Sequence, residues 1–168
     1  MTARQPSLVF DTITSLYQVL KAGTWPPLLG TNGDVLNEEV LVSFGELGAQ
    51  PPLESVAVTG SIENDDQSGW PELGQHTKRE TFSTDLVVTS SVPGRDAFEA
   101  WARLKVLVQT IDGLLRDMTS GRPVIPTAIA ELGVLSWSVT SVETFCWPTS
   151  DGGFHASAVV TVGVRAHI

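Results

Sequence analysis

The stretch that decides the fold is residues 96–118, which reads DAFEAWARLKVLVQTIDGLLRDM. Its apolar residues recur every three or four positions, the period of an amphipathic helix that buries one face. Asp96 followed by Glu99 predicts a capping box at the start of this helix. Such a helix needs a sheet to cover. The expected buried face comprises Phe98, Trp101, Leu104, Val108, Ile111, Leu115 and Met118, with Ala97, Leu107 and Leu114 beside it.

The segments after this helix carry the clearest strand pattern. Every even position of residues 154–168 is apolar, and the large apolar residues of 135–147 fall mainly at odd positions. The sequence SDGG at 150–153 predicts a hairpin with a two-residue turn at Asp151-Gly152. That turn sets Trp137 opposite Ala166 and Phe145 opposite Ala158, with Trp147 facing Ala156. All three large side chains would then face the helix side of the sheet.

The remaining pattern completes an α+β domain. A first helix is expected from Pro6-Ser7 to Gly23, and strands at 40–44, 55–62 and 79–92. The order is helix, three strands, helix, two strands. It predicts a largely antiparallel or mixed β-sheet with two helices packed on one face. A chain of 168 residues is expected to form a single domain, residues 1–168.

No arrangement of residues typical of catalysis or metal binding is recognised. His155 and His167 are twelve residues apart on one expected strand, too far to share a metal. Cys146 and His155 would lie diagonally across the hairpin at ~7–8 Å, beyond hydrogen-bond reach. One cysteine cannot form an intramolecular disulfide. We therefore predict no catalytic residue, no metal and no cofactor.

The formal net charge is −9, from 19 acidic and 10 basic residues. This balance argues against sequence-independent binding of nucleic acid, which depends on Lys and Arg neutralising phosphates. The N-terminus lacks a signal-peptide pattern, and no apolar run is long enough to span a bilayer. A soluble protein made in the cytoplasm, without a membrane partner, is expected.

Two long connections, residues 24–38 and 63–78, hold the candidate surface residues. Trp101 and Trp137 are expected in the core, whereas Trp25 either packs against the domain or docks a partner, because Trp is enriched in interface hot spots. Residues 63–78 form either a solvated loop or an arm that contacts a partner. The acidic residues of that segment and its tryptophan are Glu63, Asp65, Asp66, Glu72 and Trp70.

The assembled pattern resembles the tail terminator proteins of long-tailed bacteriophages. The similarity is one of order, length and composition over nearly the whole chain, from Leu8-Val-Phe to the final strand. Its closest cue is the segment GRDAFEAW at 94–101, which opens the main helix. The commonest members of this family are somewhat shorter, and the additional residues of this chain fall at 24–38 and 63–78.

The resemblance implies a structural virion protein at the head–tail junction, made in the host cytoplasm. It implies a homohexameric ring that stacks on the last ring of tail tube protein and ends tube polymerisation. The other side of the ring would meet a head-completion or neck protein. DNA would pass through the lumen without specific binding, and acidic walls suit such passage. The acidic segment 63–72 is expected to face the channel or a neighbouring ring.

Three alternatives remain open at this point. A related neck or head-closure protein of the same particle would differ only in its binding partner. A non-viral binding module of α+β type would show one pocket and a small ligand. An enzyme of another type would lose turnover when His155 or Cys146 is replaced.

Overall fold

The computed structural model describes residues 6–29, 33–37, 40–45, 53–64, 79–92, 96–150 and 152–167. The helices are α1 (Pro6–Ala22), α2 (Ala97–Leu115) and the short α3 (Thr127–Ala130). The strands are β1 (Leu28–Leu29), β2 (Val35–Asn37), β3 (Leu41–Phe44), β4 (Glu54–Val58), β5 (Glu63–Asn64), β6 (Arg79–Val92), β7 (Val134–Pro148) and β8 (Phe154–His167). None of the described helices is both long and apolar enough to cross a membrane.

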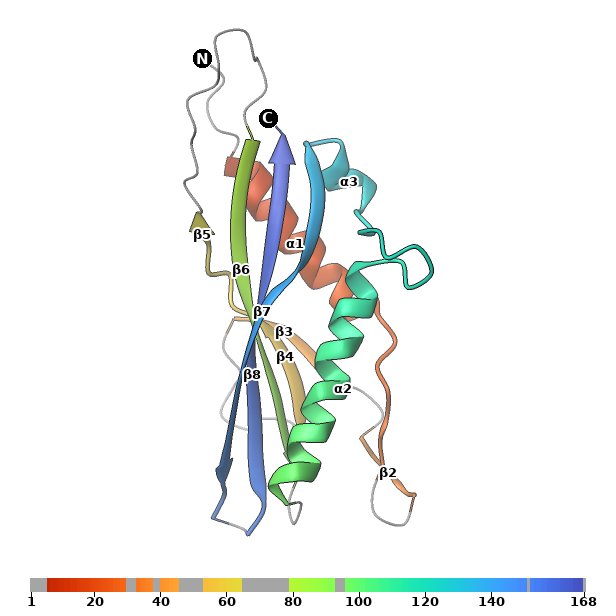
Figure 1. The fold of residues 1–168 in the computed structure, drawn as a ribbon, viewed down its shortest axis with the longest axis vertical. Coiled ribbons are helices and arrows are strands. Elements are labelled where there is room, and N and C mark those ends of the chain that lie inside the picture. The colour runs from red at the N-terminus through yellow and green to blue at the C-terminus, as the bar shows by residue number, and fades with distance from the viewer. Residues whose placement is uncertain are drawn as a thin grey trace, which may run out of the picture.

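The main sheet has the strand order β3-β4-β6-β8-β7, and the short β5 pairs with β6. The β3–β4 pair is parallel and every other pair in this sheet is antiparallel. Helices α1 and α2 lie on the same side of the sheet (Figure 1). The predicted α+β class, mixed sheet and two helices on one face are therefore confirmed. The small β1–β2 ribbon, β5 and α3 were not expected from the pattern.

Helix α2 begins as predicted, because the Asp96 carboxylate accepts a hydrogen bond of 2.8 Å from the Glu99 backbone N–H. Its buried face overlaps the one predicted, because Leu104, Ile111 and Leu115 are buried as expected. Phe98 and Met118 are each 74% exposed and Trp101 is 43% exposed, so their placement in the core was wrong. The helix also ends at Leu115, before Met118 is reached. The side chains that face the sheet are Ala100, Leu104, Leu107, Ile111 and Leu115.

The β7–β8 hairpin exists as predicted, but its register differs. Phe145 lies opposite Ser157, and Trp147 lies opposite His155. The turn is longer than two residues, since Thr149 N–H donates to the Gly153 carbonyl at 2.9 Å. The change shifts the pairing by one residue. It therefore turns Phe145 and Trp147 to the sheet face away from the helices, contrary to the prediction.

A β-bulge restores the predicted facing in the other half of β7. The pairing shifts between Val139 and Ser141, so Thr140 is an extra residue in the ladder. Gly163 makes room for it, because a Cβ there would lie 2.7 Å from Thr140 Cγ2. Beyond the bulge Trp137 is 1% exposed, and its indole N–H donates to the Leu115 carbonyl at 3.0 Å. One strand thus points Trp137 into the core and Phe145 away from it.

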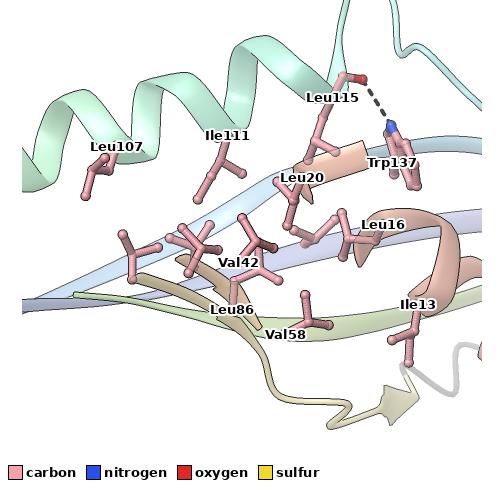
Figure 2. Close-up of a cluster of buried hydrophobic side chains, with 14 of the residues drawn as sticks. Ile13, Leu16, Leu20, Val42, Val58, Leu86, Leu107, Ile111, Leu115 and Trp137 are labelled. Atoms are coloured by element: carbon pink, nitrogen blue, oxygen red, sulfur yellow. Dashed lines mark hydrogen bonds between the residues drawn. The ribbon is translucent and has the colours of Figure 1, made fainter. Parts of the chain in front are cut away.

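The core lies between the helices and the sheet. Figure 2 shows Leu107, Ile111 and Leu115 of α2 together with Leu16 and Leu20 of α1 on one side of the sheet residues Val42 and Leu86. Beside this core, Arg103 of α2 forms a two-bond ion pair with the fully buried Glu54 of β4, at 2.6 and 2.8 Å. The same guanidinium donates to the Pro26 carbonyl at 2.6 Å. Both partners of the buried charge pair are thereby satisfied.

The observed orientation of α2 predicts that alanine substitutions at two large apolar residues of this helix lower the free energy of unfolding by very different amounts. Leu107→Ala should lower the free energy of unfolding by about 2–5 kcal/mol, because it leaves a cavity at a fully buried position. Phe98→Ala should change it by about 0.5 kcal/mol or less, because the side chain is mostly exposed. Urea denaturation of the two variants measures both values. Equal losses would contradict the orientation.

Candidate assembly surfaces

The half of β7 that follows the bulge, residues 141–148, is exposed along its whole length. It is paired with β8 on one side, and no described strand lies on its other side. Val142, Phe145 and Trp147 are 42%, 49% and 46% exposed. A long, apolar edge strand is a site where another chain adds, and proteins that remain single usually protect such edges.

The N-terminal end of α2 extends this apolar edge. The Cys146 thiol lies 4.0 Å from the Ala97 carbonyl, so the start of α2 and the end of β7 are neighbours. The rings of Phe98 and Trp101 lie 6.4 Å apart beside them. A shallow groove of about 330 Å³ runs between Trp101 and Val142. We call the five exposed residues Phe98, Trp101, Val142, Phe145 and Trp147 the α2/β7 surface.

A second apolar surface lies at the opposite edge of the sheet, on β3. Leu41 and Phe44 are 46% and 56% exposed, and Phe10 of α1 is 64% exposed. The Phe44 ring packs edge-on against Tyr17 of α1, with centroids 6.0 Å apart. Phe10 lies two helical turns before Tyr17 on the same side of α1. We call Phe10, Leu41 and Phe44 the β3 surface.

The two surfaces consist of different residues and lie on different strands. A self-complementary contact would need one surface to match itself, whereas these two edges can meet head to tail. β3 and β7 are the terminal strands of the described sheet, so each copy offers one of each. This geometry allows a ring or filament of copies.

His155 lies under Trp147 on the face away from the helices. Their ring centroids are 4.5 Å apart, and burial lowers the pKa of His155 below its ordinary value. Cys146 lies opposite Ala156, on the helix side of the sheet. The sheet therefore separates the Cys146 thiol from the His155 imidazole, which rules out a nucleophile–base pair between them.

Two of the residues predicted from sequence can be placed. Glu63 is exposed on β5, where it pairs with Ser83 of β6. Trp25 is only 9% exposed and its indole N–H donates to the Leu20 carbonyl at 3.0 Å, so of its two alternatives the structure shows packing against the domain. Its hydrogen bond and burial fix it against α1. The other predicted residues, Asp65, Asp66, Trp70 and Glu72, lie outside the described residues.

Two larger hollows are not lined by clusters of catalytic side chains. One, of about 590 Å³, lies between the end of α1 and β3, where Lys21 is its charged lining residue. The other, of about 580 Å³, lies on the face away from the helices and is lined mainly by Ser and Thr hydroxyls with Arg165. Within the described part of the chain, no three His, Cys, Asp or Glu residues cluster as metal ligands.

Comparison of the chain with protein-family models finds no match, and comparison with curated proteins finds none.

The Trp147–His155 contact predicts how the free energy of unfolding depends on pH. The lowered pKa means that the unfolded chain binds more protons than the folded one just below pH 6.5. The free energy of unfolding should therefore fall as the pH is lowered from ~6.5 through the folded pKa. Trp147→Ala should expose the imidazole, raise its pKa towards the ordinary value and weaken this pH dependence. NMR titration of the His155 ring protons measures the shift.

Leu135→Ala is the matched control, because Leu135 is an apolar residue at the other end of β7 that is 55% exposed, against 46% for Trp147. It should leave the His155 titration where it is. A His155 pKa that does not move in Trp147→Ala would show that the indole is not the group that shields it.

Proposed function

We propose that the protein is a structural virion protein of the tail terminator type. It caps the tail tube of a long-tailed phage, ends tube polymerisation and joins the tail to head-completion or neck proteins. It acts as a homohexameric ring at the head–tail junction, after synthesis in the host cytoplasm. The observation that carries the proposal is the pair of different apolar surfaces at the two opposite edges of one sheet.

Different edges support a ring for a geometric reason. Head-to-tail contacts between unlike surfaces repeat around an axis, and they close into a ring when the rotation between copies divides a full turn. A closed ring has two unlike ends. One end can stop the growth of a tube while the other binds a different protein.

The charge of the chain supports the same function. With 19 acidic against 10 basic residues, most surfaces of a ring would repel phosphate. A channel that DNA must cross benefits from this repulsion, because bound phosphates would slow the passage. The α+β order of elements also agrees with the resemblance stated from the sequence.

Electron microscopy of the purified protein mixed with the tube protein encoded in the same genome tests the proposal. Tubes should stop growing and carry a ring at one end. Phe145→Glu should abolish capping, because it places a charge in the α2/β7 surface. Val124→Glu is the matched control: Val124 is 50% exposed, as Phe145 is 49% exposed, but lies outside both apolar surfaces. Tubes that grow past the wild-type protein would contradict the proposal.

A further inference from the structure

We propose that residues 141–145 of β7 in one copy pair antiparallel with β3 of the next copy, so that the sheets join edge to edge around the ring. This inference rests on the ring of the proposed function and names its subunit contact. The occupant of the β7 edge is a second copy of this chain. Three independent features of the described residues lead to it: strand direction, strand level and the match of exposed side chains.

Strand direction follows from the sheet. β3 is parallel to β4, and each step from β4 through β6 and β8 to β7 is antiparallel. β3 therefore runs opposite to β7. Rotation about an axis along the strands does not reverse a strand, so the neighbour's β3 arrives antiparallel to β7. Antiparallel pairing is slightly more stable than parallel pairing, and here the ring symmetry requires it.

Strand level fixes the register. Rotation about the same axis also keeps each residue at its own height, so a residue of β3 meets the residue of β7 at the same level of the sheet. One level of the ladder contains Val42, Val56, Val88, Ala158 and Thr144, each opposite the next. In a ring whose strands run along its axis, Val42 of one copy therefore lies opposite Thr144 of the next copy.

The exposed side chains match in this same register. It sets Phe145 opposite Leu41, and Val142 opposite Phe44. The first pair lies on the face away from the helices and the second on the helix face, so every exposed apolar residue of β3 meets one of β7 on its own face. A slip of two residues along β7 would set Phe44 opposite Thr144 and lose one of the two pairs.

The remaining pair of this register is Glu143 with Ser43. The Ser43 hydroxyl is buried and has no hydrogen-bond partner among the described residues. A carboxylate brought opposite it on the same face supplies an acceptor. The register therefore adds a polar contact between its two apolar pairs.

The apolar area is adequate for a specific contact between copies. Eight large apolar side chains of the α2/β7 and β3 surfaces are between 42% and 74% exposed. Together they offer on the order of 600–800 Å². With the backbone of the paired strands this approaches the ~1,000 Å² that marks the lower limit for a biological interface. Each copy makes two such contacts in a ring, which strengthens the assembly further.

Disulfide trapping tests the pairing. In a Cys146→Ser background, which removes the single native cysteine, Ser43→Cys and Glu143→Cys are introduced together. Directly opposite residues have Cβ atoms ~4.5–5.5 Å apart, close enough to bridge by oxidation or by a short bis-maleimide. The double variant should give a ladder of covalent multimers on non-reducing gels, both alone at high concentration and on capped tubes. Each single variant should stay monomeric, and circular dichroism confirms folding.

Each other outcome overturns the inference in a recognisable way. Dimers from Glu143→Cys alone would show that β7 pairs with itself. Rings that are visible in the microscope but yield no covalent ladder would reject this strand pairing and leave the proposed function standing. Tubes that remain uncapped, with neither rings nor ladder, would reject both.

Discussion

The structure depends on covering the apolar row of β8. Ala156, Ala158, Val160, Val162, Val164 and Ala166 all point to one face, and none is more than 2% exposed. β8 lies between two long partner strands, so only helices packed on that face can remove this row from water. The small Ala156 and Ala158 leave room beneath the start of α2. Covering the row fixes which face of β6 and β7 is buried, and within the described part of the chain it leaves the other face of the sheet without helices.

The Thr140 bulge determines what those uncovered parts present. A regular strand would send Trp137, Phe145 and Trp147 to one face, whereas the extra residue reverses the facing of the two aromatics beyond it. Because β7 is a terminal strand of the described sheet, Phe145 and Trp147 lie beside an edge on which no described strand pairs. Gly163 on β8 allows the bulge to form. The exposed apolar edge is thus a consequence of backbone geometry, and the proposed assembly would cover it.

The spacing of apolar residues, together with the local capping and turn residues, was enough to predict the order of elements, the capped start of α2 and the existence of the hairpin. It correctly placed Leu104, Ile111 and Leu115 of α2 in the core, but it could not show that Ala100 is buried while the larger apolar Phe98 and Trp101 are exposed. No local signal marks Thr140 as a bulge, so the register of β7 and the surface role of Phe145 were missed. The Arg103–Glu54 pair joins residues 49 positions apart, and no local spacing in the sequence relates them.

Amide hydrogen exchange as a function of protein concentration tests the central claim, that the free half of β7 is covered by another copy. Peptides that contain residues 41–44 and 141–148 should gain protection together as the protein assembles, because both outer edges become hydrogen-bonded. Peptides from the buried face of α2 should not change. Assembly that leaves both edges exchanging as fast as in the monomer would contradict the account.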